Sequence, residues 1–216
     1  MTAPNEETPA ALGLRDRRRR ETCRELAAAA TDLFELQGVH GTTVDEIAHA
    51  AGISSRTFFR YADTKENAVF VDDRGGEELV VRVRREVAAG NDPIATIEQA
   101  QLDLLDAFDA QPTATHAHVL RVRRLVISEP SLLAVALARD EESVAQLTAI
   151  VVQTKSTPTD ELRARVLVTA VGTAMRLAFD EWARRSERGE ETRLRGLYEV
   201  IRADLSAFFS GQAPTN

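Results

Sequence analysis

Hydrophobic residues recur at three- and four-residue steps along most of the chain, which is the spacing of one side of an α-helix. The first stripe predicts a helix that begins at Asp16 and ends at Gly38, where glycine can leave the helical conformation. Its apolar positions are Cys23, Leu26, Ala27, Ala30, Leu33 and Phe34. Residues 1–14 contain Pro, Thr and Glu without periodicity, so we expect a disordered leader there.

Two short helices separated by a tight turn are expected next. Thr43, with Glu46 three residues later, has the arrangement of a capping box and predicts the start of the first one. Gly52 can adopt the positive φ needed to leave that helix, and Ser54 or Ser55 can cap the second. The second helix is expected to run through Phe58, Phe59 and Tyr61.

Glycine and proline punctuate the rest of the chain. Lys65–Phe70 is expected to open a fourth helix, which Gly75-Gly76 kinks or breaks before it continues through Leu79–Val87. Further on, a proline stands at or just before the start of successive helices. These helices are predicted at Ile94–Ala110, Thr115–Ser128, Ser131–Lys155, Thr159–Glu187 and Thr192–Phe209.

Composition agrees with an all-α fold. The 216 residues are 44% hydrophobic with only seven Pro and eleven Gly, so the chain can bury a substantial core and favours helices over sheets. The two short helices and the tight turn between them would form a helix-turn-helix at 43–61. The length leaves open whether the chain is one large domain or two small ones.

The net charge of −7 argues against a protein that coats nucleic acid or an anionic membrane with its whole surface. Any contact with nucleic acid must therefore be local. A single cysteine cannot form an internal disulfide, and no apolar stretch is long enough for a membrane span. A cytoplasmic protein without a membrane partner is the expectation.

The sequence offers no set of residues for catalysis. His116 and His118 form an HxH pair, but no cysteine or acidic group at metal-ligand spacing completes a site. Nucleophile-elbow, phosphate-loop, dinucleotide and zinc-protease motifs are absent. We therefore expect no enzyme, no cofactor and no metal.

Positive charge gathers around the helix-turn-helix. The second helix of such a motif fits the major groove of DNA, and here its exposed side would carry Arg56 and Arg60. A basic run, Arg17 to Arg20, precedes the apolar stripe of the first long helix and suits phosphates or a minor groove. Taken singly, a helix pair with a glycine turn is common and an arginine run is usually solvated. Together they favour DNA binding.

The segment from Thr42 to Phe70, TTVDEIAHAAGISSRTFFRYADTKENAVF, resembles the signature of the TetR family of regulators, and the resemblance covers about Arg17–Val71. It implies that Ile53 and Phe58 are core residues, and that Thr43 and Lys65 hold phosphates. The resemblance and the basic run together give a predicted DNA-binding set of Arg17, Arg18, Arg19, Arg20, Thr43, Ser54, Ser55, Arg56, Thr57, Phe59, Arg60, Tyr61 and Lys65.

Two positions depart from the family pattern. Ala62 stands where the family usually has a bulky aromatic residue, so the packing beneath the second helix is either looser or filled by a neighbouring residue. Phe59 stands where tyrosine is frequent, and it either touches a thymine methyl or packs inward. Arg56 and Arg60, four residues apart, are the candidates for bidentate contact with guanine.

The resemblance implies a three-helix DNA-binding head over residues 15–71. It also implies a larger helical domain over 72–210 that dimerises and binds a small effector, followed by a tail at 211–216. A dimer interface is predicted on the last two long helices, although the same stripes could instead complete the core of one chain. The predicted interface residues are Val171, Ala174, Ala178, Trp182, Leu197, Ile201 and Leu205. The predicted effector site comprises Leu105, Phe108, Arg121, Leu125, Leu147 and Arg176.

The expected function is a homodimeric repressor that a lipophilic effector releases from a palindromic operator. The segment Leu120–Ala134 has a short resemblance to TetR-like regulators with acyl-CoA-like ligands. An activator of the same fold and a helical interaction dimer that does not read DNA are the alternatives.

Overall fold

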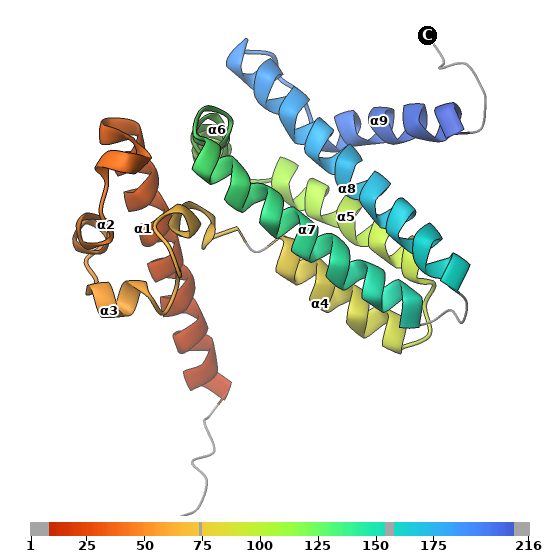
Figure 1. The fold of residues 1–216 in the computed structure, drawn as a ribbon, viewed down its shortest axis with the longest axis horizontal. Helices are drawn as coiled ribbons and strands as arrows, with labels where there is room; N and C mark the ends of the chain where they lie inside the picture. The colour runs from red at the N-terminus through yellow and green to blue at the C-terminus, as the bar shows by residue number, and fades with distance from the viewer. Residues whose placement is uncertain (1–8, 74, 154–157, 210–216) are drawn as a thin grey trace, which may run out of the picture. The chain divides into compact units, whose positions relative to one another are not determined.

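The computed structural model describes residues 9–73, 75–153 and 158–209, and all regular structure in those ranges is helical (Figure 1). The elements are α1 (Pro9–Gly41), α2 (Val44–Ala50), α3 (Ser55–Phe58), the 3₁₀ helix η1 (Glu66–Phe70), α4 (Gly75–Ala88), α5 (Pro93–Asp109), α6 (Thr113–Ser128), α7 (Pro130–Gln153), α8 (Pro158–Glu187) and α9 (Leu194–Phe209). The all-α prediction is confirmed.

Helix α1 begins seven residues earlier than predicted. The expected leader covered residues 1–14, but α1 already starts at Pro9. Proline suits the first turn of a helix because its missing N–H has no partner there. Residues 1–8, like the predicted tail at 211–216, lie outside the described residues. The leader prediction is therefore wrong for residues 9–14.

Contacts divide the chain into two compact units that the predicted boundary at residue 71 only partly captures. The N-terminal unit comprises residues 1–74 together with Arg121–Val135, and the C-terminal unit comprises Gly75–Leu120 and residues 136–216. The insertion of Arg121–Val135 into the N-terminal unit was not predicted. As a result, α6 and α7 each begin in one unit and end in the other.

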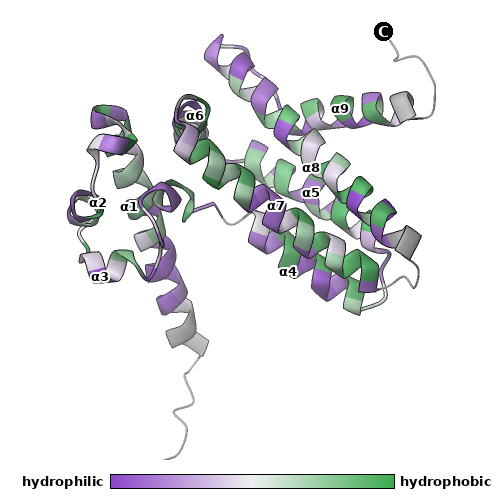
Figure 2. Ribbon diagram, in the orientation of Figure 1, coloured by the Kyte–Doolittle hydropathy of each residue, from purple (hydrophilic) through white to green (hydrophobic). Residues whose placement is uncertain are grey.

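The core of the N-terminal unit forms along the apolar side of α1. Leu26, Ala27 and Ala30 are fully buried there, together with Ile47 of α2 and Phe58 of α3. Figure 2 shows the contrast along α1, whose N-terminal part is polar and whose second half carries apolar residues. The predicted break at Gly38 is confirmed, because its φ of 76° lies in the left-handed region.

The link that follows the helix-turn-helix differs from the expected kinked fourth helix. Residues 66–70 form the 3₁₀ helix η1, with Ala68, Val69 and Phe70 buried. Residues 72–73 are non-helical, and α4 starts at Gly75 instead of breaking there. A side chain at Gly76 would approach Ser143 Oγ at 3.1 Å, so a small residue suits the close packing of α4 on α7.

Two apolar clusters build the C-terminal unit. The first joins α4, α5, α7 and α8, and its buried members are Leu79, Val80, Val83, Ile97, Ala100, Leu147, Ile150, Val151, Ala164 and Val168. The second joins α5, α8 and α9, and its buried members are Leu105, Ala174, Ala178, Trp182, Ala183, Leu194, Leu197 and Tyr198. Burial of this apolar surface is the main stabilising contribution to the unit.

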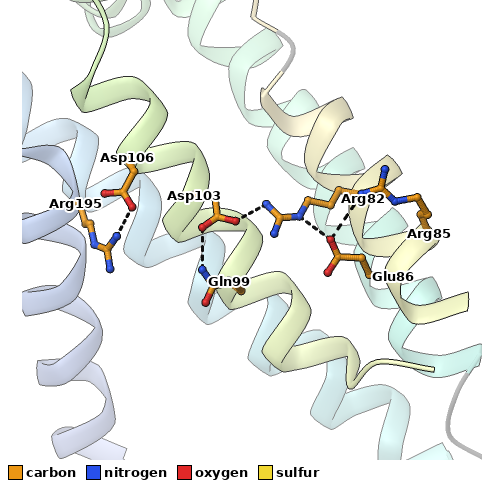
Figure 3. A network of polar contacts seen from close by, with 7 residues as sticks. All are labelled: Arg82, Arg85, Glu86, Gln99, Asp103, Asp106 and Arg195. Atoms are coloured by element: carbon orange, nitrogen blue, oxygen red, sulfur yellow. Dashed lines mark hydrogen bonds and ion pairs between the residues drawn. The ribbon is translucent and has the colours of Figure 1, made fainter. Parts of the chain in front are cut away.

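Polar contacts hold α5 against both of its neighbours. Arg82 of α4 donates to its own helix at Glu86 (2.8 Å) and pairs with Asp103 of α5 (2.7 Å) (Figure 3). At the end of α5, the two carboxylate oxygens of Asp109 accept the backbone N–H groups of Leu194 (2.8 Å) and Arg195 (3.1 Å). Asp109 thereby satisfies the first free N–H groups of α9 from another helix.

Candidate nucleic-acid interface

The capping box predicted at the start of α2 is present. Thr43 Oγ1 accepts the backbone N–H of Glu46 (3.3 Å), and Glu46 Oε2 accepts the backbone N–H of Thr43 (2.8 Å). These hydrogen bonds to the ionised form lower the pKa of Glu46, the backbone bond from Thr43 being the largest cause. The box fixes where α2 begins, and with it the direction in which the chain enters the turn.

The charge of Glu46 makes the head sensitive to acid. Because the pKa of Glu46 is lowered on folding, ionised Glu46 stabilises the folded state at pH values above the ordinary glutamate pKa. This stabilisation is lost as the pH falls through the lower pKa of the folded state. We expect the thermal midpoint of the N-terminal unit to fall less between pH 6 and pH 3.5 in Glu46→Gln than in the wild type. Circular dichroism melts at both pH values test this. Parallel losses in the two proteins would contradict it.

The turn between α2 and α3 is set by glycine and serine as predicted. Gly52 has a φ of 67°, which favours glycine at this position. Ser54 caps α3, because its Oγ accepts the Thr57 N–H (3.2 Å) and lies 2.9 Å from Thr57 Oγ1. Ser55 Oγ donates to Asp45 Oδ1 of α2 (2.5 Å). Three predicted DNA-facing hydroxyls thus also hold the two short helices together.

Helix α3 is shorter than predicted, ending at Phe58. Beyond it the chain tightens, and the N–H groups of Arg60 and Tyr61 donate to the carbonyls three residues earlier, Thr57 O (3.1 Å) and Phe58 O (2.8 Å). The Phe58 side chain is fully buried and anchors this segment. Ala62 is also buried, with 4% of its surface exposed, so its small side chain is closely surrounded.

The outer side of this segment carries the predicted reading residues. Arg56 and Arg60 are exposed, and Phe59 has 56% of its surface exposed. The Phe59 ring meets Phe58 edge-on with ring centres 5.4 Å apart, so it points outward rather than into the core. The Arg60 guanidinium lies over the Tyr61 ring, 5.1 Å from its centre, which restricts the arginine before it meets a ligand.

Lys65 has a structural partner that the sequence did not reveal. Its Nζ donates to the backbone carbonyl of Val39 (2.7 Å), in the last turn of α1 after Gly38, and to that of Thr42 (2.9 Å), between α1 and α2. These bonds occupy two of the three ammonium protons. Lys65 therefore fixes the α1–α2 junction, and its contact with a phosphate stays a prediction.

The basic run lies within helix α1 and does not precede it. Arg17, Arg18, Arg19 and Arg20 are exposed on α1. Consecutive helical residues differ by about 100° in direction, so four neighbours cannot face one surface. Arg17 and Arg20 do share a side, together with exposed Arg24, because the spacing is three and seven residues. Arg24 was missed because the run was interpreted as a basic arm and not as part of one face of a helix.

The predicted effector residues are divided between the two compact units and between the two apolar clusters. Leu125 belongs to the N-terminal unit, Leu147 to one cluster of the C-terminal unit, and Leu105 and Phe108 to the other. Arg176 forms an ion pair with Asp140 (3.3 Å).

Arg121 is not a free anion ligand either. It forms hydrogen bonds with Asp32 and Glu35 of α1, and the bonds to Glu35 are the largest cause of a raised pKa. The proposed carboxylate or phosphate ligand would have to displace both acidic side chains. The prediction of Arg121 as an effector residue is therefore wrong in this structure.

The predicted dimer residues are also largely internal. Ala174, Ala178, Trp182 and Leu197 are buried within one chain, while Val171, Ile201 and Leu205 pack in part against the same clusters. The alternative, that these stripes complete the core of one chain, is correct for the four buried residues. Exposed apolar residues on the same helices include Leu162, Val166, Leu177 and Val200.

The remaining histidine candidate is part of an aromatic cluster. His116 Nε2 lies 2.9 Å from Phe108 O, and its ring lies 4.6 Å from Phe108 and 5.7 Å from Trp182, measured between ring centres. Within the described ranges, no three His, Cys, Asp or Glu side chains are placed to share a metal ion. The same ranges contain no helix that is both long and apolar enough to span a bilayer.

Comparisons with known proteins agree with this geometry. The pattern of the family described as "Bacterial regulatory proteins, tetR family" matches residues 26–68, which include α2, α3 and most of η1. The HTH-type transcriptional regulator TcmR of Streptomyces glaucescens is 30% identical over 192 residues, covering 86% of this chain and 84% of its own. The HTH-type transcriptional repressor KstR2 of Rhodococcus jostii is 37% identical over 106 residues, covering 49% and 52%.

One solved structure is also similar. The TetR-family repressor FadR of Thermus thermophilus, solved in complex with lauroyl-CoA, superposes with a TM-score of 0.49 at 22% identity, covering 90% of this chain and 98% of its own. The extended match to TcmR, together with the buried Phe58 and the capped, glycine-linked helices, shows that this chain belongs to the TetR family of transcriptional regulators, with its helix-turn-helix DNA-binding domain in the N-terminal unit.

Proposed function

We propose that the chain is a cytoplasmic repressor that binds a palindromic operator as a homodimer and leaves it when a small lipophilic effector binds. The outward position of Arg56 and Arg60 around the buried Phe58 anchor carries the proposal. A two-fold dimer would present this segment twice, to half-sites about one helical turn apart. Salt-dependent titration of the wild-type chain against DNA from its own promoter region tests operator binding. Activation, or failure to bind any operator, would be the contrary outcomes.

Sequence reading is assigned to the two exposed arginines. We expect Arg56→Ala and Arg60→Ala each to reduce discrimination between the operator and a mutated operator by about 1–3 kcal/mol, because a bidentate contact with guanine is lost. Fluorescence anisotropy titrations on matched and mutated duplexes measure this. Arg18→Ala serves as the control, since it removes an arginine from α1 without touching α3. Unchanged discrimination in both test variants would refute the assignment.

Phosphate contact is assigned to one side of α1. Figure 1 shows the N-terminal half of α1 projecting beyond α3, and Arg17, Arg20 and Arg24 lie on one face of that helix. We expect Arg20→Ala to weaken binding to all sequences alike and to reduce the slope of log K against log salt by about 1. Arg18→Ala, on another face, should leave the slope nearly unchanged. Equal slope changes in the two variants would contradict a single contact face.

We infer that the dimer forms through the exposed apolar side of α8 and α9. Leu162, Val166 and Leu177 are spaced by four and eleven residues, so they share one side of α8, and Val200 is 60% exposed on α9. A stripe of exposed apolar side chains of this kind is typical of a helix–helix interface. The family relationship supports a second copy of the chain as the occupant.

We infer a lipophilic effector, with an acyl-CoA-like compound as the first candidate. The support is the apolar content of both clusters in the C-terminal unit and the short sequence resemblance at Leu120–Ala134. Native mass spectrometry of protein purified from its source would identify a bound compound. The proposal further requires that this compound lower operator affinity, as measured by anisotropy; an unaffected affinity would contradict it.

A further inference from the structure

Arg60 and Tyr61 are in contact with each other on the outer side of the helix-turn-helix. The Arg60 guanidinium lies over the Tyr61 ring, 5.1 Å from its centre, and Arg60 Nη2 lies 3.4 Å from Tyr61 Oη. A cation within about 6 Å of a ring centre is attracted by the electron-rich face of the ring. The hydrogen bond is long and Arg60 is exposed, so the ring contact is the stronger of the two.

The backbone at the end of α3 makes this contact possible. Consecutive residues of a regular α-helix point about 100° apart, so their side chains do not face each other. Helix α3 ends at Phe58, however, and Arg60 and Tyr61 lie in the tightened turn beyond it. The N–H groups of Tyr61 and Ala62 both donate to Phe58 O, at 2.8 and 2.9 Å. The half-buried Tyr61 is therefore attached to the fully buried Phe58, and its ring offers Arg60 a fixed surface.

Arg56, the other exposed arginine of this segment, is not held in the same way. Among the residues that the structure describes, its side chain forms no ion pair, hydrogen bond or ring contact. An arginine side chain loses much rotational freedom when it is ordered, and this loss opposes binding. Arg60 has lost part of that freedom before a ligand binds, whereas Arg56 keeps it. The two arginines therefore differ in pre-organisation.

The contact with Tyr61 leaves Arg60 able to bind a base. A guanidinium has five N–H donors in one plane, and Tyr61 Oη accepts from only one of its nitrogens, Nη2. A bidentate contact with the O6 and N7 atoms of guanine needs two donors. Enough N–H groups therefore remain for this contact while the ring still holds the arginine.

We propose that Tyr61 is a positioning residue whose ring holds the Arg60 guanidinium, so that Arg60 is ordered for contact with guanine before DNA binds, and Arg56 is not. The ring, and not the phenol hydroxyl, supplies the effect. The proposal rests on the proposed function for its consequence, because base discrimination requires operator binding. The contact between the two side chains is measured without DNA.

The first test observes this contact by NMR in the whole chain, with isotope-labelled arginine. The two signals are assigned by their loss in Arg60→Ala and Arg56→Ala. Because an aromatic ring shifts the signals of protons above its face upfield, we expect the Arg60 δ-protons to lie upfield of those of Arg56 in the wild type and in Tyr61→Phe. In Tyr61→Leu the two sets of signals should coincide. Coincident signals in the wild type overturn the proposal, even if circular dichroism shows that Tyr61→Leu is unfolded.

The second test measures discrimination at single operator base pairs by anisotropy titration. The base pair that Arg60 contacts is the one at which Arg60→Ala loses discrimination, and the base pair of Arg56 is found in the same way. Tyr61→Leu should reduce discrimination at the Arg60 base pair by about 2–5-fold, the size expected for an exposed cation–π contact, and leave the Arg56 base pair unaffected. Tyr61→Phe should retain wild-type discrimination, since it keeps the ring.

A double-mutant cycle shows whether Tyr61 acts through Arg60. Arg60→Ala combined with Tyr61→Leu should discriminate as well as Arg60→Ala alone. If Tyr61→Leu instead weakens binding to every sequence alike, or has the same effect with and without Arg60, Tyr61 acts on DNA independently and the proposal is overturned. If the wild type binds no operator, the proposed function fails, while the NMR signals still decide whether Tyr61 holds Arg60.

Discussion

Replacing Phe58 by alanine is expected to unfold the helix-turn-helix and abolish operator binding. The Phe58 side chain is fully buried, and the backbone around it supports both α3 and the tightened turn after it. Truncation of a buried phenylalanine costs about 3–5 kcal/mol through lost transfer free energy and the cavity left behind.

The adjacent Phe59 is the matched control. It has the same side chain one residue further along the chain, but 56% of its surface is exposed. Phe59→Ala should change the free energy of unfolding by no more than about 0.5 kcal/mol. Denaturant unfolding followed by circular dichroism compares the two variants, and anisotropy follows operator binding. Equal destabilisation by the two substitutions would show that α3 is not anchored by Phe58.

Local signals made most of the fold predictable. The capping box at Thr43 and Glu46 involves residues three apart, and the positive φ at Gly38 and Gly52 is needed within a single turn. Such features depend only on residues that are close together in the sequence, so they can be predicted from the sequence alone. The proline that opens α5 is of the same kind, because Pro93 follows the capping residue Asp92.

The partners of long side chains could not be predicted in the same way. Lys65 reaches a carbonyl 26 residues away, and Arg121 binds a carboxylate 86 residues away. A helical pattern shows that these side chains lie outside the apolar stripe of their segment. It does not show which other element they contact. The resemblance to TetR regulators pointed Lys65 toward DNA, and the idea of an anionic effector pointed Arg121 toward a pocket, whereas both bind the protein itself.

Some residues of the candidate interface therefore also hold the helix-turn-helix together. Ser54, Ser55 and Thr57 form hydrogen bonds within the head, while Arg56, Phe59 and Arg60 extend from it. Substitutions in the first group would change both folding and binding, and substitutions in the second would change binding alone. Stability and sequence discrimination therefore have to be measured together to assign a role to any of these residues.

Periodicity leaves the partner of an apolar stripe undetermined, and α8 shows the consequence. Its two apolar sides are both helical in spacing, yet Trp182 is buried against α5 and α9, whereas Val166 and Leu177 are exposed. The prediction placed Trp182 in the dimer interface, but Trp182 lies on the internal apolar side of α8 and not on the exposed one. Only the packing of α5 and α9 on α8 decides which stripe is internal.

Replacing Trp182 by alanine should therefore destabilise each chain by about 3–5 kcal/mol, as expected for truncation of a buried aromatic residue. The Trp182 ring packs against Phe108 (5.0 Å) and Phe179 (6.4 Å), measured between ring centres, and these contacts disappear together. Val200→Glu is the contrasting variant, because Val200 is exposed on α9 and its replacement puts a charge on the proposed interface.

Denaturant unfolding and light scattering distinguish the two variants. We expect Trp182→Ala to lose stability while the protein that remains folded is still dimeric, and Val200→Glu to become monomeric with its helical content retained. If Trp182→Ala instead yields a stable, folded monomer, the tryptophan belongs to the interface after all and the core described for α5, α8 and α9 is incomplete. Trp182 and Val200 lie in the same unit. If both variants lost their fold, folding of that unit would require the dimer contact.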